Sequence, residues 1–85
     1  FHLAAIFDNN PAVIGTSISG LEVLDAGEIE LFCRENRVDV AILCVPNEVA
    51  ELTAERLIGC GVTGFWNFTH HDISMGRPGL VVENA

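Results

Sequence analysis

The sequence predicts an α/β fold in which a mostly parallel sheet is flanked by helices. The segment Val38–Pro46 is short, apolar and rich in β-branched residues, and it lacks the two-residue alternation of a half-exposed strand. Such a run is typical of a parallel strand that is covered by helices on both sides. Segments with helical spacing lie before and after it, and further apolar segments of strand length occur towards both ends. This alternation of strands and helices predicts the α/β class.

The first part of the chain is expected to hold a strand, a turn and a second strand. Leu3–Asp8 is apolar and ends in a carboxylate. Asn9-Asn10-Pro11 favours a turn, because Asn tolerates left-handed backbone and Pro fixes φ. Residues 12–20 are expected to be irregular with glycine hinges, and Leu21–Leu24 is expected to be a short strand. A helix then begins at Asp25, which has the spacing of a capping box with Glu28, and ends near Asn36.

The second helix is expected to run from Glu48 to about Cys60. Pro46 has no N–H group and ends the central strand, and the Asn47 side chain is expected to cap the helix. The inward side chains of the two helices follow helical spacing: Ile29, Phe32 and Cys33 in the first, and Val49, Ala50, Thr53, Ala54, Leu57 and Ile58 in the second. Two strands and a loop are expected to complete the chain: Phe65–Phe68, then residues 69–79, then Leu80–Glu83.

Composition limits the classes of function. At 85 residues, with 49% hydrophobic and 19% charged residues, the chain is expected to form one small globular domain. No apolar run approaches the roughly 20 residues that span a bilayer, and no signal-peptide pattern is recognised. A net charge of −8, with four Arg and no Lys, argues against direct binding of a phosphate backbone. Three cysteines without a Cys-x-x-Cys pair suit a reducing cytoplasm, and we expect all three to be structural thiols.

Asp8 is the first candidate binding residue. A carboxylate at the carboxyl end of an early strand is where dinucleotide-binding folds bind the adenosine ribose hydroxyls. Its negative charge would also repel the additional phosphate of NADP. The alternative is a solvated turn residue that bonds into Asn9-Asn10.

Two further strand ends carry candidates. Val45, Pro46 and Asn47 could bring backbone groups and a helix N-terminus to a phosphate or to the nicotinamide side of a ligand, or they could form an ordinary turn. Asn67, which precedes Phe68, could bond the amide of a ligand or could cap the following loop.

Other motifs argue against catalysis. His70 and His71 are interpreted as loop surface, because adjacent residues in an extended segment point in opposite directions and would not readily share one metal ion. No sequence pattern pairs a nucleophile with a base. A dinucleotide-binding unit carries a Gly-x-Gly-x-x-Gly motif between its first strand and first helix, and no such motif stands at that place in this chain. We therefore expect that strand and its glycine-rich loop to lie upstream of Phe1.

A series of short motifs along the whole chain carries a family resemblance. These motifs are Phe7-Asp8, Pro11, Gly15, Ala41-Ile42, Val45-Pro46, Gly61-Val62, Trp66-Asn67-Phe68 and Val81-Val82-Glu83-Asn84. In order and spacing they resemble the Rex family of redox-sensing transcriptional repressors. The resemblance implies a partial Rossmann-like fold that lacks the first strand and the glycine-rich loop. Residues 1–85 would then be the C-terminal portion of a Rossmann-type, CoA-binding-like domain for NADH or NAD⁺.

The resemblance also implies roles for the candidate residues. Asp8 falls on the ribose-binding acid, Val45-Pro46 on the turn beside the cofactor, and Asn67-Phe68 near the nicotinamide. Thr69-His70-His71 and Glu51 depart from the family pattern around that pocket. The protein would be a cytoplasmic homodimer without catalytic activity that senses NADH against NAD⁺. It would bind DNA only through an N-terminal winged-helix domain outside this chain, and no membrane. The alternative is a fragment of an NAD-dependent dehydrogenase or of a CoA-binding ligase subunit.

The absent first strand predicts a gap at the centre of the sheet. In the Rossmann order 3-2-1-4-5-6, Leu3–Asp8 would be strand two and Val38–Val45 strand four, with strand one between them. Unpaired buried backbone groups cost about 1–3 kcal/mol each, and unpaired edges are templates for further pairing. We therefore expect Leu3–Asp8 either to move beside Val40–Val45 or to pair with a second copy of the chain.

Overall fold

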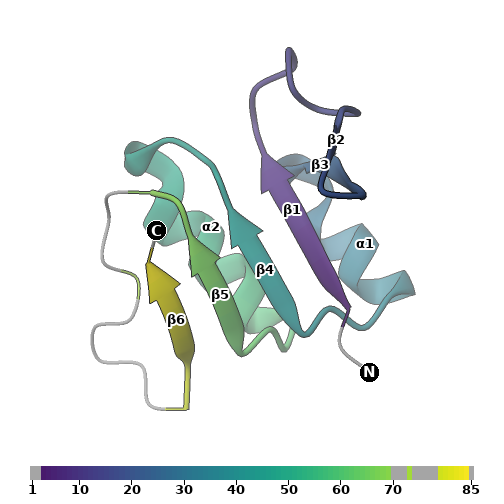
Figure 1. Cartoon of the computed structure of the whole chain (residues 1–85). Coiled ribbons are helices and arrows are strands. Elements are labelled where there is room, and N and C mark those ends of the chain that lie inside the picture. Colours follow the sequence, from purple (N-terminus) through teal and green to yellow (C-terminus); the bar gives the residue numbers. More distant parts are fainter. Residues whose placement is uncertain (1–2, 70–72, 74–78, 85) are drawn as a thin grey trace.

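The computed structural model describes residues 3–69, 73 and 79–84, which form six strands and three helical segments (Figure 1). The strands are β1 (Ala4–Asp8), β2 (Ser17–Ile18), β3 (Leu21–Asp25), β4 (Val40–Leu43), β5 (Gly64–Asn67) and β6 (Val81–Asn84). The helices are the 3-10 helix η1 (Ala26–Glu28), α1 (Ile29–Glu35) and α2 (Asn47–Gly59). The predicted α/β class is confirmed. Among these described residues no helix is long and apolar enough to cross a membrane.

All the described strands belong to one sheet with the order β2-β3-β1-β4-β5-β6. Neighbouring strands from β3 to β6 run parallel, whereas β2 pairs with β3 in antiparallel fashion. The turn between β2 and β3 has positive φ at Ser19 (52°) and at Gly20 (83°), as a tight two-residue hairpin turn requires. The prediction of an irregular segment over residues 12–20 is therefore wrong for the two residues of β2.

β1 lies directly beside β4, so the expected gap at the centre of the sheet is closed within one chain. Pairing begins with Ala4 opposite Val40 and continues to Phe7 opposite Leu43. Beyond the end of β4, the Cys44 N–H donates to the Phe7 carbonyl oxygen at 3.3 Å. The first of the two expected outcomes is thus confirmed, and it brings the carboxyl ends of β1 and β4 together.

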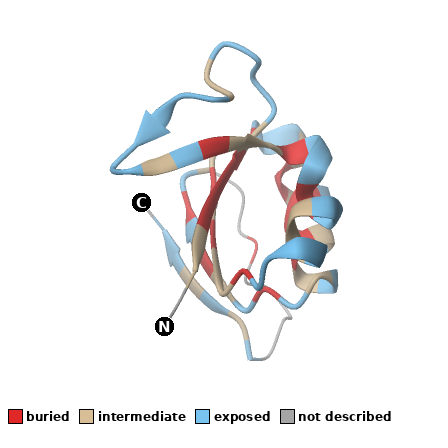
Figure 2. Cartoon of the chain, turned by 90° about the vertical axis from the view of Figure 1, so that its right-hand side faces the viewer, coloured by how far each residue is buried: buried red, intermediate tan, exposed pale blue. Residues whose placement is uncertain are grey.

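Both helices, α1 and α2, cover the same face of the sheet, as Figures 1 and 2 show. The connections β3–α1–β4 and β4–α2–β5 move in the same direction across the sheet. Because such crossovers are right-handed, their helices fall on one face. The connection from β1 to β3 moves in the opposite direction but holds turns and β2 in place of a helix. For the described residues, the prediction of helices on both sides of the central strand is therefore wrong.

The hydrophobic core lies between the sheet and the helices. It contains alternate strand residues and the inward side chains of both helices: Ala5, Phe7, Ala41, Leu43, Phe65, Ile29, Ala50, Ala54 and Leu57. The opposite face of the sheet, here called the open face, leaves Trp66 49% exposed and Val81 65% exposed. The predicted burial of Phe65–Phe68 is therefore correct for Phe65 and Asn67 and wrong for Trp66 and Phe68, because successive side chains of a strand point to opposite faces.

The two helix starts differ from one another. Asp25 caps η1, because its Oδ1 accepts from the Gly27 N–H at 2.9 Å, which confirms the predicted cap. α2 begins at Asn47, with Pro46 in the N-cap position and no side-chain cap bond, so the predicted cap by Asn47 is wrong. Pro46 adopts φ −60° and ψ 152°, the extended conformation that an N-cap residue requires, and this places the helix start one residue earlier.

Candidate functional site

Three strand ends that carry candidate residues lie side by side at one edge of the sheet. β1, β4 and β5 are parallel neighbours, with Phe7 opposite Leu43 and Leu43 opposite Asn67. The segments that follow these strands therefore leave the sheet at its carboxyl edge. The six residues singled out from the sequence lie at these strand ends, in the turns directly after them or, for one of them, at the start of α2: Asp8, Val45, Pro46, Asn47, Asn67 and Phe68. In open α/β sheets this edge is where ligands bind.

Asp8 is the last residue of β1 and organises the turn behind it. Its Oδ1 accepts from the N–H of Asn9 at 2.7 Å and from the N–H of Asn10 at 3.1 Å. Asn10 in turn accepts from the Ala12 N–H at 3.0 Å, so the predicted turn is present. Oδ2 of Asp8 has no partner among the described residues and can still accept a hydrogen bond from a ligand. The turn role and a ligand role are therefore compatible.

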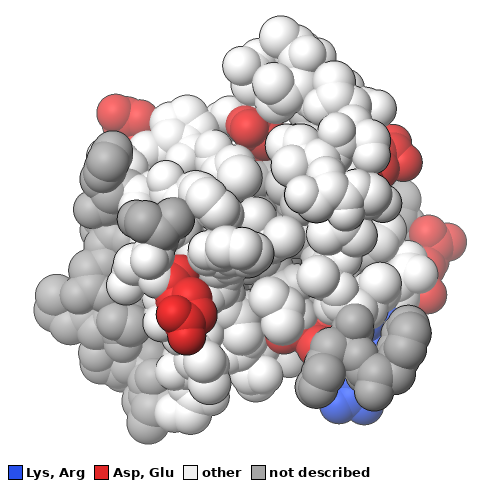
Figure 3. All heavy atoms as spheres, in the orientation of Figure 1, with Lys and Arg blue, Asp and Glu red and all other residues white. Residues whose placement is uncertain are grey.

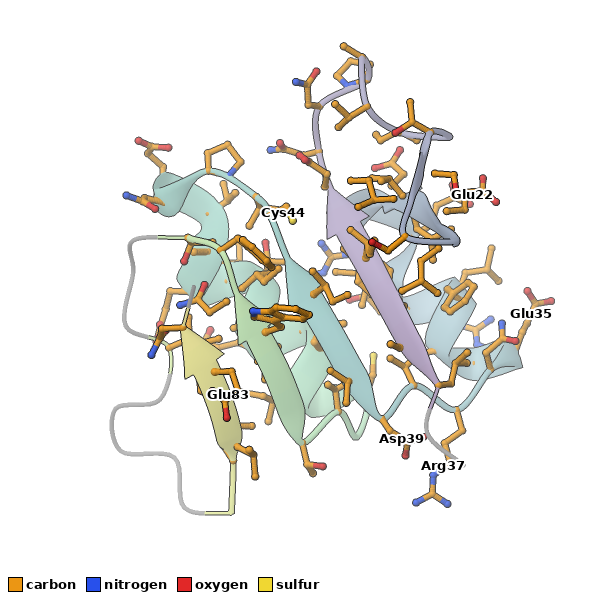
Figure 4. All side chains as sticks on the ribbon, viewed as in Figure 1. Glu22, Glu35, Arg37, Asp39, Cys44 and Glu83 are labelled. Carbon is orange, nitrogen blue, oxygen red and sulfur yellow. The ribbon has the colours of Figure 1, made fainter. Side chains whose placement is uncertain are left out.

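Asp8 also acts on Cys44, the first residue after β4. The pKa of the Cys44 thiol is raised, first by burial and then by the negative charge of Asp8. Figure 4 shows Cys44 at the carboxyl end of β4, next to the end of β1. The carboxyl edge is thus negatively charged where β1 meets β4, with a protonated thiol beside it. Sequence reasoning did not include Cys44 in the site, because Cys44 meets Asp8 only through the pairing of β1 with β4.

The turn from β4 into α2 presents backbone and a helix N-terminus to the same edge. Val45 is buried and anchors the turn, whereas Pro46 and Asn47 are exposed. α2 extends from Asn47 to Gly59 and begins after a three-residue turn from β4, so the positive end of its dipole and its first N–H groups lie at the carboxyl edge of the sheet. Glu48 in the first turn is a carboxylate at this positive end. These backbone donors can bind a polar or anionic ligand group.

Asn67 ends β5 and is 1% exposed. Its Nδ2 donates to Asn84 Oδ1 at 3.0 Å, and its Oδ1 accepts from both the N–H and the hydroxyl of Thr69. Phe68 is 49% exposed, and its ring centroid lies 5.3 Å from that of Trp66. The loop-capping interpretation of Asn67 thus has direct hydrogen-bond support, and Phe68 offers an exposed ring at the same edge.

The open face carries a shallow hollow that is separate from these turns. It has a volume of about 420 Å³ and is lined mainly by β4, β5 and β6, including Val40, Gly64, Trp66 and Val81. In the space-filling view of Figure 3, this side of the sheet is largely uncharged, with scattered acidic side chains. His70, His71 and Asp72 lie outside the described residues. Within the described part of the chain, no group of three or more His, Cys, Asp or Glu side chains could hold a metal ion.

The parallel sheet and its carboxyl edge define the class of domain: an α/β domain with the architecture of nucleotide-binding folds. The chain belongs to the CoA binding domain family, because the model of that family matches residues 1–71.

Among curated proteins, the chain is similar to redox-sensing transcriptional repressors called Rex. It is 39% identical over 85 residues to Rex of Clostridioides difficile (strain 630), covering all of this chain and 40% of that protein. It is 41% identical over 85 residues to Rex of Caldanaerobacter subterraneus subsp. tengcongensis, covering 38% of that protein. The resemblance to Rex is thus confirmed, and the chain spans about two fifths of the length of the curated relatives it matches.

Solved structures give the same result. The structure of RSP, a Rex-family repressor, matches with a TM-score of 0.75 and 38% identity, covering all of this chain and 40% of that chain. RSP in complex with β-NADH matches with a TM-score of 0.74 and 37% identity, covering 98% of this chain and 40% of that chain. RSP has also been solved with β-NAD⁺ and operator DNA (TM-score 0.73, 37% identity, covering 95% of this chain and 37% of that chain).

Proposed function

We propose that residues 1–85 are the C-terminal portion of an NAD(H)-binding domain in a redox-sensing transcriptional repressor. The observation that carries this proposal is that the ends of β1, β4 and β5, each with a residue that could bind a ligand, lie side by side at the carboxyl edge. The chain is also about 40% identical to Rex proteins. The solved complexes of the Rex-family repressor RSP with β-NADH and β-NAD⁺ support the choice of cofactor.

Within this proposal, Asp8 binds the adenosine ribose of the cofactor. Its Oδ1 holds the Asn9-Asn10 turn, and its Oδ2 accepts from a ribose hydroxyl. A 2′-phosphate at the same position would meet the negative charge of Asp8, and this repulsion favours NADH over NADPH. Val45, Pro46 and Asn47 place the α2 N-terminus beside the cofactor, and Asn67 and Phe68 border its nicotinamide side.

The proposed domain senses and does not catalyse. A homodimer would exist in two arrangements of its subunits, which bind NADH and NAD⁺ with different affinities. Cofactor binding would shift the population between these two arrangements, and this shift would change the affinity of the protein for operator DNA. DNA contact belongs to an N-terminal winged-helix domain outside this chain, because the net charge of −8 disfavours binding of phosphates here. The protein would act in the cytoplasm, a reducing compartment that suits a chain whose three cysteines are free in the structure.

Equilibrium titration of the full-length protein tests this function. NADH, NAD⁺, NADPH and coenzyme A are titrated separately, and binding is followed by NADH fluorescence and by calorimetry. We expect NADH to bind more tightly than NADPH and coenzyme A to bind weakly. Tight binding of coenzyme A together with no binding of NADH would overturn the proposal in favour of a CoA-binding function.

A further inference from the structure

Cys33 and Cys60 line one hollow where α1 packs on α2. Cys33 is in α1 and Cys60 is the C-cap residue of α2. Both line a polar hollow of about 410 Å³, together with Arg34, Arg37 and neighbouring residues. Both are half-buried, so small molecules in solvent can reach the hollow. The C-terminal ends of helices in an α/β sheet lie at the amino edge of the strands, opposite the proposed cofactor site.

A bidentate ion pair, one helical turn before the two cysteines, joins α1 to α2. Arg56 of α2 donates to both carboxylate oxygens of Glu30 of α1, at 2.6 Å and 2.7 Å. Cys33 follows Glu30 by three residues and Cys60 follows Arg56 by four, so each cysteine lies on the same helix face as its charged residue. Both helices lead from the carboxyl edge of the sheet back to its amino edge and therefore run in the same direction. About one turn beyond the ion pair, the two cysteines therefore come close together and line one hollow.

The two cysteines line the same hollow and lie close enough for their thiols to interact. Burial, the proximity of Cys60 and a side-chain hydrogen bond with Cys60 raise the pKa of Cys33 to about 11. A protonated thiol attacks other sulfur atoms slowly, so Cys33 suits the second step of a two-step oxidation. The third cysteine, Cys44, lies at the carboxyl edge of the sheet, near Asp8, and belongs to a different environment. From the sequence alone all three cysteines were expected to be structural thiols, because nothing in the sequence shows how α1 packs against α2.

We propose that Cys33 and Cys60 form a reversible dithiol–disulfide pair that ties the end of α1 to the end of α2. The oxidant is a low-molecular-weight disulfide such as oxidised glutathione. The Cys60 thiolate attacks one sulfur of that disulfide and releases one small thiolate, which takes up a proton. Cys33 then loses its proton, attacks the Cys60 sulfur of the mixed disulfide and releases the second small thiol. The two cysteines lose two protons and two electrons, which the small disulfide gains. This pair goes beyond the proposed cofactor function and does not depend on it.

The test is oxidation of the full-length protein in glutathione buffers of increasing oxidised fraction. Free thiols are then alkylated, and the protein is digested with trypsin without reduction. Cleavage after Arg34, Arg37 and Arg56 places Cys33, Cys44 and Cys60 on three different peptides, so each possible disulfide gives a distinct mass. We expect a Cys33–Cys60 cross-linked peptide that lacks two hydrogen atoms relative to the two thiol peptides, and we expect reductant to reverse it.

Variants and a dithiol probe separate this pair from unspecific oxidation. Cys44→Ser should retain the cross-link, whereas Cys33→Ser and Cys60→Ser should lose it and should accumulate a mixed glutathione adduct on the remaining cysteine. Phenylarsine oxide, which binds two adjacent thiols, should protect both cysteines of the reduced wild-type protein from alkylation together, and this measurement needs no variant. Separate alkylation of both cysteines after oxidation, or a disulfide that includes Cys44, would overturn the proposal.

Discussion

Asn67 at the end of β5 donates from its side-chain amide to Asn84 Oδ1 at the end of β6, at 3.0 Å. Its own oxygen accepts from the N–H of Thr69 at 3.0 Å and from the Thr69 hydroxyl at 2.6 Å. One buried side chain therefore joins the ends of two parallel strands to the segment that follows the first of them. Asn67, which the resemblance to Rex places near the nicotinamide, therefore also stabilises the ends of β5 and β6.

Replacing Asn67 with Ala should lower the free energy of unfolding. The change leaves the Thr69 N–H and the Asn84 side chain without their Asn67 partner, and an unmade buried hydrogen bond costs about 1–3 kcal/mol. Urea unfolding of the full-length protein measures the effect. Asn84→Ala is the matched control, because it removes the same 3.0 Å hydrogen bond by changing the partner that is exposed to solvent. Its effect on the free energy of unfolding should be smaller. Equal losses for both variants would contradict a special role for the buried Asn67.

Replacing Asp8 should change cofactor affinity in a way that distinguishes its two oxygens. Asp8→Ala should weaken NADH binding by about 1–3 kcal/mol, the scale of a hydrogen bond to a charged group, and should relax discrimination against NADPH. Asp8→Asn keeps an oxygen for the Asn9 and Asn10 N–H groups but removes the charge, so it should preserve the turn while improving NADPH binding. Titration of both variants with both cofactors is the measurement. Unchanged affinities would remove Asp8 from the site.

The isolated chain of residues 1–85 should bind NADH weakly and should not bind DNA. It has no Gly-x-Gly-x-x-Gly loop between a strand and the helix that follows it to admit the pyrophosphate, because its one run of this spacing, residues 59–64, leads from α2 into β5. Its net charge is −8. Fluorescence titration with NADH and a gel-shift assay with duplex DNA check the two parts. Micromolar affinity for NADH would show that the proposed pocket is placed wrongly.

The Glu30–Arg56 ion pair should make stability depend on pH in acid. A side-chain hydrogen bond from Arg56 is the largest cause that lowers the pKa of Glu30 from 4.5 to about 2. A carboxyl group with a lowered folded-state pKa stabilises the fold above its unfolded pKa and loses that effect as pH falls through its folded pKa. The stability difference between wild type and Glu30→Gln should therefore be fully present above pH 4.5 and should shrink towards pH 2.

This difference is measured by urea unfolding of both proteins across the acid range. Because Glu30 is solvent-exposed, added salt should reduce the difference as well. A difference that stays constant from neutral pH to pH 2 would show that the ion pair does not contribute.

Gly64 should not tolerate a methyl group, although its backbone is not in the left-handed region. A Cβ atom on Gly64 would lie 3.2 Å from Val40 Cγ2 and 3.3 Å from the Asp39 carbonyl oxygen. That carbonyl also accepts the Gly64 N–H at 3.2 Å, so the close approach belongs to the pairing of β4 with β5. Gly64→Ala should destabilise the fold by about 1–3 kcal/mol through overpacking.

Gly59→Ala is the control for this prediction. Gly59 is the last residue of α2, and a Cβ atom there meets nothing within 4 Å. Because Ala is the better helix former by about 1 kcal/mol, this change should be neutral or stabilising. Thermal unfolding of the two variants in parallel measures both effects. A stabilised Gly64→Ala variant would contradict the packing described for β4 and β5.

The sequence predicts most strands and both helices because burial leaves a pattern in it. The apolar runs that became β1, β4 and β5 were located to within two residues, and the inward positions of α2 include the buried Ala50 and Leu57. The placement of Asp8 and Asn67 at the ends of strands followed from the same runs. β2 was missed because two exposed residues, Ser17 and Ile18, give no periodic signal. The hairpin is visible only in their antiparallel pairing with β3 and in the positive φ values of the turn.

Features that depend on how elements meet could not be predicted in this way. An apolar run shows that a strand is buried, but it does not show which segment covers each face, so the open face was missed. The proximity of Cys44 to Asp8 and of Cys33 to Cys60 depends on strand order and on helix packing. The helix start at Asn47 depends on the backbone angles of Pro46.

The open face of the sheet has a calorimetric consequence. The heat capacity of a protein rises on unfolding mainly because apolar surface becomes hydrated, by about 12–15 cal/mol/K per residue in ordinary domains. Trp66 and Val81 are already about half hydrated or more in the folded chain, so their contribution to this rise is reduced. The isolated chain should therefore show a smaller heat-capacity increment per residue than a domain covered on both faces. Its stability should then vary less steeply between cold and warm conditions.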